Sequence, residues 1–225
     1  MITAAANPKL KLVRKLLAQK RKREELGLFA AEGEDLVAAA AVAGIEPVEL
    51  LVAGETVEPS LLAAVSTLPH PARVVAVYRT ADLPTERREV ALALWHVADP
   101  GNVGTLLRAA DAFGAAVALS GGCADPLGPK ALRASAGAVF RVPLLRFADA
   151  PGRRVALVAH GGAPLHELDL AGATTFVLGA EREGLPEDVL TASDDVATIV
   201  LPGAAESLNV AVAGAIALYE RSRRA

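Results

Sequence analysis

The chain of 225 residues has one cysteine, Cys123, and its aromatic residues make up only 4% of the sequence. A single cysteine excludes a disulfide framework and a cysteine metal cluster, and no histidine pair has the spacing of metal ligands. No apolar run reaches the roughly 18–20 residues that cross a membrane. The first residues lack the apolar core of a secretory signal. These absences predict a protein without metal or membrane partner, located in the reducing cytoplasm.

Common nucleotide-binding and hydrolase motifs are also missing. No G-x-G-x-x-G sequence follows the first strand-like segment, and no nucleophile elbow is present. Residues 179–186, GAEREGLP, have the glycine spacing of a phosphate loop. They lack the Lys-Ser/Thr pair that would hold phosphate and magnesium. The sequence therefore argues against a P-loop NTPase, a dinucleotide-dependent dehydrogenase and a serine hydrolase.

Charge is distributed unevenly along the chain, although the net charge is only −3. Residues 9–23 carry eight basic residues and no acid, whereas residues 24–72 carry nine acids and no lysine or arginine. Leu10, Val13 and Leu17 keep one apolar face, so residues 7–26 are predicted to form one basic helix. Such a helix is either a solvated charged face or a surface that contacts phosphates. The complete absence of acids in residues 9–23 favours phosphate contact.

Strand-like and helix-like segments alternate on both sides of a charged, proline-containing linker near residues 81–90. We therefore predict two α/β domains, residues 1–88 and residues 89–225. Residues 90–99, VALALWHVAD, are continuously apolar at their start, as buried parallel strands are. Trp95 and His96 are expected in the core of this second domain. A mostly parallel sheet would carry its ligand site beyond the carboxyl ends of its strands.

Three loops of the second domain combine glycines with a few polar groups: residues 99–115, 178–190 and 197–220. In the last of these loops Glu206, Ser207 and Asn209 stand at the start of an almost wholly apolar helix, predicted over residues 207–221. Ser207 is the expected N-cap of that helix. An unpaired Asn209 in a buried first turn would cost about 1–3 kcal/mol, so we expect it to face a site or a neighbouring loop.

In this order and at this spacing the three loops resemble the motifs of the SpoU-type (TrmH-like) RNA 2′-O-ribose methyltransferases. The first motif contains Asn102, Gly104 and Arg108 and extends through DPLGPKALRASAGAVFRVP, the second is LGAEREGL, and the third is ESLNVAVAGAIALYE. Residues 12–37 resemble the ribosomal-protein-like RNA-binding domain of many members. One departure is Val200, which stands where the family usually has proline.

The resemblance implies an α/β fold with a C-terminal trefoil-knotted, mostly parallel-sheet methyltransferase domain and a small N-terminal α/β RNA-binding domain. It implies S-adenosylmethionine as cofactor and a homodimer formed through the methyltransferase domain. The implied catalytic group is Arg108, Asn102, Glu181, Ser207 and Asn209. The implied cofactor pocket is Leu178, Gly179, Ile199, Leu201 and Leu208. The expected RNA-contacting residues are Arg14, Lys15, Lys20, Arg21, Lys22, Arg23, Lys130 and Arg133.

Methyl transfer to a ribose hydroxyl needs positioning more than covalent catalysis, which suits loops of small residues and amides without metal ligands. A guanidinium stays protonated, so Arg108 is expected to orient the ribose and its phosphate and not to act as a plain base. The predicted substrate is structured RNA, with ribosomal RNA favoured over transfer RNA. Two alternatives remain open: a non-catalytic RNA-binding protein that keeps the fold, and a methyltransferase that acts on a base nitrogen.

Overall fold

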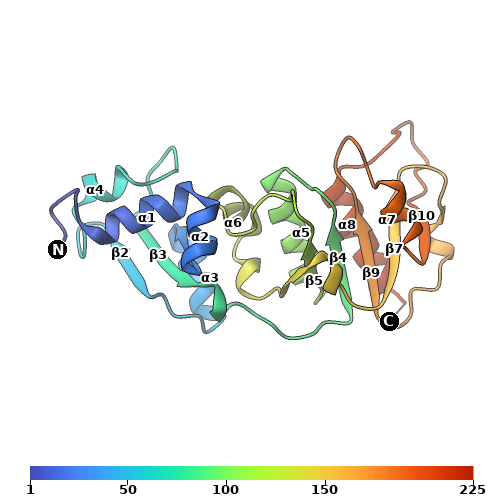
Figure 1. The fold of residues 1–225 in the computed structure, drawn as a ribbon, viewed down its shortest axis with the longest axis horizontal. Helices are drawn as coiled ribbons and strands as arrows, with labels where there is room; N and C mark the ends of the chain where they lie inside the picture. The colour runs from blue at the N-terminus through green and yellow to red at the C-terminus, as the bar shows by residue number, and fades with distance from the viewer. Residues whose placement is uncertain (225) are drawn as a thin grey trace. The chain divides into compact units, whose positions relative to one another are not determined.

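The computed structural model describes residues 1–224, which form two compact units (Figure 1). The first unit is Met1–Leu83 together with Asp125–Arg141, and the second is Pro84–Ala124 together with the chain from Val142 onward. A segment from the middle of the sequence thus belongs to the N-terminal unit. Within residues 1–224, no helix combines the length and the apolar character that crossing a membrane requires.

The first unit is built on a three-stranded antiparallel sheet of order β1-β3-β2. Its strands are β1 (Leu28–Glu32), β2 (Glu49–Val52) and β3 (Val74–Arg79). Its helices are α1 (Pro8–Ala18), α2 (Lys20–Leu26), α3 (Glu34–Val42), α4 (Pro59–Ala63) and α6 (Pro129–Ser135), with 3₁₀ turns at Thr80–Asp82 and Ala138–Phe140. Both α1 and α6 pack against β1.

The basic segment forms two helices, so the prediction of one helix over residues 7–26 was wrong. Helix α1 starts where the Asn7 side chain accepts a hydrogen bond from the Lys9 amide at 2.9 Å. It ends because Gln19 is extended, with φ −129° and ψ 110°. After this break α2 turns Arg23 into the protein, where its Nη1 donates to the Leu16 carbonyl at 2.5 Å.

The second unit is built on a seven-stranded parallel sheet of order β6-β5-β4-β9-β7-β10-β8. The prediction of a mostly parallel α/β sheet is confirmed. Its strands are β4 (Val90–Leu94), β5 (Ala116–Leu119), β6 (Leu144–Arg146), β7 (Arg153–Val158), β8 (Ala163–Pro164), β9 (Thr174–Leu178) and β10 (Asp195–Thr198). Its helices are α5 (Pro100–Ala112), α7 (Glu187–Thr191) and α8 (Val210–Ser222), with 3₁₀ turns at Phe147–Asp149 and Leu165–Glu167.

Helices α5 and α8 pack closely against each other. Gly214 permits this approach, because a β-carbon there would lie 2.5 Å from Cδ2 of Leu106. The beginnings of α5 and α8 are thereby fixed relative to each other, and both helices begin at loops that the sequence motifs occupy.

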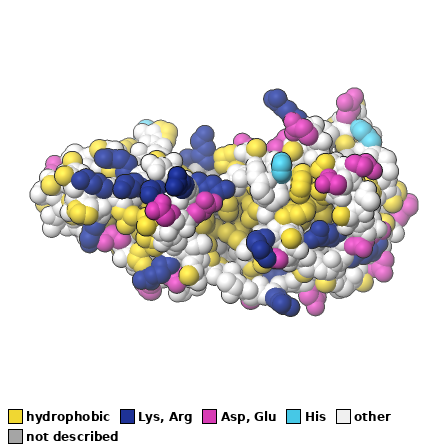
Figure 2. Space-filling view, in the orientation of Figure 1, with side chains coloured by type: hydrophobic (Ala, Val, Ile, Leu, Met, Phe, Trp, Pro, Cys, Tyr) yellow, Lys and Arg dark blue, Asp and Glu magenta, His cyan; other side chains and the backbone are white. Residues whose placement is uncertain are grey.

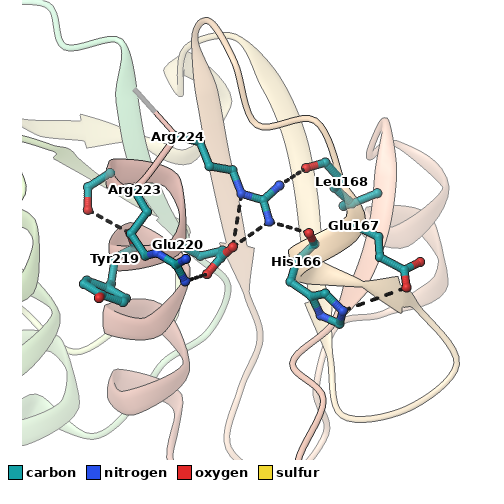
Figure 3. A network of polar contacts seen from close by, with 8 residues as sticks. His166, Glu167, Leu168, Tyr219, Glu220, Arg223 and Arg224 are labelled. Atoms are coloured by element: carbon teal, nitrogen blue, oxygen red, sulfur yellow. Dashed lines mark hydrogen bonds and ion pairs between the residues drawn. The ribbon is translucent and has the colours of Figure 1, made fainter.

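The end of α8 is tied to the turn at Leu165–Glu167 (Figure 3). The guanidinium of Arg224 donates to the Leu168 carbonyl at 2.5 Å and also to the His166 carbonyl. Glu220 pairs with Arg224 at 2.5 Å and with Arg223 at 3.5 Å, which adds charge-assisted bonds to the same contact. The C-terminal helix is therefore fixed at its end as well as at its start. The knotted threading that the resemblance implies stays a prediction.

Candidate active site

A cavity of about 680 Å³ opens beyond the carboxyl ends of β7 and β9 and beside the start of α8. This is where an open parallel sheet binds its ligand, and the volume suits a small organic molecule. The five residues expected to hold the cofactor all line this cavity: Leu178, Gly179, Ile199, Leu201 and Leu208. Val200, which replaces the usual proline, is 57% exposed and does not line it.

The loop after β9 is a tight backbone turn whose residues 179–185 line the cavity. Ala180 and Gly184 exchange two backbone hydrogen bonds, at 3.0 and 3.1 Å. A β-carbon on Gly179 would lie 2.3 Å from the carbonyl carbon of Gly184, so only glycine fits there. Glycine at position 179 therefore lets the turn close tightly, and the residues of the turn form one wall of the cavity.

Three side chains from three separate segments of the chain form a continuous hydrogen-bonded row. The amide of Asn102, on α5, donates to Oε1 of Glu181 at 2.9 Å. The Oδ1 of Asn102 accepts from Nδ2 of Asn209 at 3.0 Å. The Asp99 carboxylate caps α5 by accepting from the Asn102 backbone at 2.8 Å, which fixes where Asn102 stands. Glu181 and Asn209 also line the large cavity. The row therefore joins the three sequence motifs at one edge of the cavity.

Asn209, and not Ser207, is the N-cap of α8. Its Oδ1 accepts from the backbone of Ala211 at 2.9 Å and of Val212 at 3.4 Å, and the helix begins at Val210. Ser207 lies before the helix, exposed, on the cavity wall. The predicted apolar helix is not fully buried within one chain, because Val212 is 47% exposed and Tyr219 53% exposed.

Arg108 stands apart from the other residues of the implied catalytic group. It is exposed on α5 and does not line the large cavity. In the part of the chain that the structure describes, it has no hydrogen bond and no ion pair. The structure thus brings Asn102, Glu181, Ser207 and Asn209 together within one chain, without Arg108.

The eight basic residues expected to contact RNA all belong to the first unit, including those of α6. Figure 2 shows a row of Lys and Arg side chains across this unit. Arg14, Lys15, Lys20, Arg21, Lys130 and Arg133 are exposed, and Lys22 is half-buried in a 2.7 Å pair with Glu25. Lys20 also faces an acid, Glu24, at 3.7 Å.

Arg23 differs from its basic neighbours and cannot contact a phosphate in this conformation. Only 7% of its side chain is exposed, and its Nε and Nη2 donate to Oδ2 of Asp125 at 2.8 and 2.6 Å. The expectation that Arg23 contacts RNA is therefore corrected. Its buried guanidinium links α2, the end of α1 and the returning segment 125–141.

Sequence reasoning missed His96 and Trp95, which it expected in the core. His96 is exposed and Trp95 half-buried, directly after β4. Strand β4 ends at Leu94 because His96 adopts a left-handed backbone with φ 54°. One feature of the sequence could have indicated this location. Both residues directly follow a buried parallel strand at its carboxyl end, where such sheets bind ligands. Within residues 1–224, no group of three His, Cys, Asp or Glu side chains is arranged to hold a metal.

Two family models match the chain and together span most of its length. The SpoU rRNA methylase family matches residues 89–219. The MRM3-like substrate binding domain matches residues 7–81.

Proteins of known sequence or structure resemble the chain over nearly its full length. The 23S rRNA (guanosine(2553)-2′-O)-methyltransferase RlmP of Bacillus subtilis is 34% identical, over 97% of each chain. The AdoMet-bound rRNA methyltransferase of Sinorhizobium meliloti is 30% identical with a TM-score of 0.85, covering 99% of this chain and 97% of its own. The SpoU methyltransferase AviRb of Streptomyces viridochromogenes, in complex with AdoMet, is 27% identical with a TM-score of 0.83, over 97% and 98%.

Proposed function

The chain belongs to the SpoU rRNA methylase family, and we propose that it transfers a methyl group from S-adenosylmethionine to a ribose 2′-hydroxyl of RNA. The observation that carries this proposal is the hydrogen-bonded row Glu181–Asn102–Asn209 at the edge of the large cavity. It sets polar side chains where a ribose hydroxyl can meet a methyl donor. Relatives named as 23S rRNA 2′-O-methyltransferases support ribosomal RNA over transfer RNA.

The large cavity fits S-adenosylmethionine in size and in chemistry. Leu178, Ile199, Leu201 and Leu208 supply apolar walls for an adenine ring. The turn at Ala180–Gly184 also lines the cavity, and Gly179 lets that turn close tightly. When bound, the cofactor supplies a methyl carbon on a positively charged sulfur. Because that charge disappears during transfer, the chain needs to align the two reactants and exclude water, and not to provide a covalent intermediate.

The row of three side chains holds the ribose in line with the methyl donor. Glu181 fixes the Asn102 amide by a charge-assisted bond, and Asn209 fixes the opposite end of that amide. Asn102 is thereby held in one orientation, with its remaining hydrogen-bonding capacity available to the nucleotide. Ser207, exposed on the cavity wall, is a second polar group within this site. Arg108, which remains a cation, stabilises the negative charge that develops on the ribose oxygen as the hydroxyl proton passes to solvent.

Arg108 acts in the site of a second copy of the chain. It is exposed and does not line the cavity of its own chain. An apolar face with exposed Phe113, Val212 and Tyr219 lies on α5 and α8, where a hollow of about 610 Å³ also includes Asn102 and Asn209. A two-fold dimer through this face brings each Arg108 to the partner's site.

The first unit holds the RNA substrate through its exposed basic side chains, and the protein works in the cytoplasm on structured RNA. The charged side chains contact phosphates, which position RNA without reading its sequence. The match of residues 7–81 to a substrate binding domain supports this role.

The decisive test measures transfer of labelled methyl groups to total RNA from cells that lack this gene. Wild type is expected to label RNA, with 2′-O-methylnucleosides found after nuclease digestion and mass spectrometry. Arg108→Ala is expected to lose transfer by at least about a hundredfold while calorimetric binding of S-adenosylmethionine stays within twofold. A labelled base would indicate a base methyltransferase. RNA binding without any labelling would indicate a non-catalytic binding protein.

A further inference from the structure

The imidazole of His96 lies beside the Glu181–Asn102–Asn209 row, in a cavity that Asn102 and Glu181 also line. Among the residues that the structure describes, neither of its ring nitrogens makes a hydrogen bond, and the side chain is exposed. It lines a shallow cavity of about 460 Å³ that also includes Asn102 and Glu181. A free imidazole next to two members of the row is a group available to substrate.

The position of this imidazole is fixed by its backbone and by its neighbours. The His96 amide donates to Oγ of Ser120 at 2.9 Å. Trp95 stacks on the imidazole with ring centroids 4.8 Å apart and planes 8° apart. Gly122 lies against the same ring, since a β-carbon there would come within 3.3 Å of its Cγ. Trp95 is itself held edge-on by Phe147 at 5.2 Å.

The backbone of His96 is unusual for a residue other than glycine. Its φ of 54° lies in the left-handed region, which residues other than glycine seldom adopt. Strained residues of this kind cluster at functional sites. His96 thus combines an unusual backbone, an exposed side chain and ring nitrogens without a hydrogen bond among the described residues. These properties are typical of a group that contacts a ligand and not of a core residue.

The charges around the shallow cavity indicate which part of a nucleotide it accepts. Asp99, Glu181 and Glu183 line it together with one cation, Arg182. An excess of carboxylates repels a phosphate but accepts the ring and amino groups of a base. RNA is commonly read at splayed bases through their hydrogen-bonding edges.

We propose that His96 hydrogen-bonds the base of the nucleotide that is methylated, and thereby contributes to the choice of that nucleotide. This inference rests on the proposed function. His96 is a specificity-determining residue in it: the Glu181–Asn102–Asn209 row holds the ribose, and the imidazole edge meets the base attached to that ribose.

The test compares the full-length wild type with His96→Gly and His96→Asn. Glycine removes the ring and suits the left-handed backbone, so the variant is expected to fold. Asparagine also tolerates that backbone and keeps hydrogen-bonding capacity. The matched control is His160→Gly, which removes another exposed histidine from the same unit that does not line this cavity.

The substrates are four RNA fragments that carry A, C, G or U at the nucleotide mapped as methylated by wild type. For the preferred base, His96→Gly is expected to raise KM for RNA about tenfold, the value of one hydrogen bond. It leaves binding of S-adenosylmethionine unchanged, and discrimination among the four bases falls by a similar factor. His96→Asn regains part of the discrimination, and His160→Gly behaves as wild type.

Two results would overturn the inference alone: unchanged base discrimination in His96→Gly, or a KM that rises equally for all four bases, which indicates a phosphate contact. Absence of methyl transfer by wild type to any RNA would overturn the proposed function and this inference with it.

Discussion

The side chain of Asn209 makes two kinds of hydrogen bond with separable consequences. Its Oδ1 caps α8, and its Nδ2 donates to Asn102 in the proposed site. The cap contributes to stability, whereas the bond to Asn102 orients a group that we propose contacts the substrate. One residue therefore links the folding of the last helix to the geometry of the site.

Serine at position 209 separates the two functions. Asn209→Ser keeps a capping oxygen, so the free energy of unfolding in urea is expected to change by less than about 0.5 kcal/mol. Methyl transfer is expected to fall about tenfold or more because the donor to Asn102 is gone. Asn209→Ala serves as the comparison and loses about 1 kcal/mol of stability as well. Equal activity of Asn209→Ser and wild type would show that the bond to Asn102 is dispensable.

Tyr78 gives the first unit a pH dependence at alkaline pH. Burial raises the pKa of Tyr78 to about 12, and the charge of Glu46 adds to the shift. Its hydroxyl is buried with no hydrogen-bond partner in the part of the chain that the structure describes. The folded state thus holds the phenol proton more tightly than the unfolded chain does.

The contribution of the protonated Tyr78 hydroxyl to the free energy of unfolding is fully present below pH 10 and is lost as pH rises from 10 to 12. Relative to Tyr78→Phe, wild type is expected to lose about 2–3 kcal/mol across that interval. Urea unfolding of both proteins at pH 7, 10, 11 and 12 measures the difference. If the unfolding free energies of wild type and Tyr78→Phe changed equally with pH, a raised pKa of Tyr78 would be contradicted.

At the scale of elements, α2 divides its basic residues between two roles. Arg21 is exposed, whereas Arg23 is buried against Asp125 and the end of α1. Both residues are arginines, so charge alone does not tell which one is buried. The break at Gln19 decides this, because it sets which side of α2 faces the sheet.

Two matched substitutions on α2 are expected to separate stability from RNA binding: Arg23→Met lowers stability, and Arg21→Met weakens RNA binding. Arg23→Met leaves the Asp125 charge buried without its partner and is expected to cost about 3 kcal/mol of unfolding free energy. Arg21→Met is expected to change stability by less than about 0.5 kcal/mol. Arg21→Met is also expected to reduce the steepness of log RNA affinity against log salt concentration by about 0.7–0.9, which corresponds to the loss of one phosphate contact.

Urea unfolding and RNA binding at several salt concentrations check both variants. An unchanged salt slope in Arg21→Met would make α2 a solvated charged face. Retained stability in Arg23→Met would show that the buried pair contributes little.

At the scale of the whole molecule, assembly decides whether the proposed site is complete. Val212→Glu places a charge on the exposed apolar face of α5 and α8 and is expected to convert the proposed dimer to monomers in analytical ultracentrifugation. Val42→Glu is the control, because Val42 is 84% exposed on α3 of the other unit. A dimer that survives Val212→Glu would place the interface elsewhere.

Mixed dimers test whether Arg108 serves the partner's site. Arg108→Ala and Asn102→Ala are each expected to be inactive alone. An equal mixture of refolded subunits contains mixed dimers with one intact site each, so activity returns to about a quarter of wild type. No recovery would mean that Arg108 and Asn102 act within one chain.

Much of the site could be predicted from the sequence, because short motifs and their order along the chain indicate which residues form it. The alternation of strand-like and helix-like segments predicted a mostly parallel α/β sheet with its ligand site beyond the strand ends. The motif resemblance named five residues that do line the large cavity. Residue types alone could not separate Arg23 from its neighbours or reveal His96. Burial and backbone conformation decided those two residues, and both depend on contacts distant in sequence.

The sequence by itself determined the fold class, the family motifs and the basic segment, since each is written in residue type and spacing. Only the tertiary structure decided that Asp125–Arg141 joins the N-terminal unit and that Asn209 caps α8 while bonding Asn102. The physical reason is that hydrogen bonds and buried ion pairs join residues about a hundred positions apart. No local pattern encodes such partners, because packing alone brings them within bonding distance.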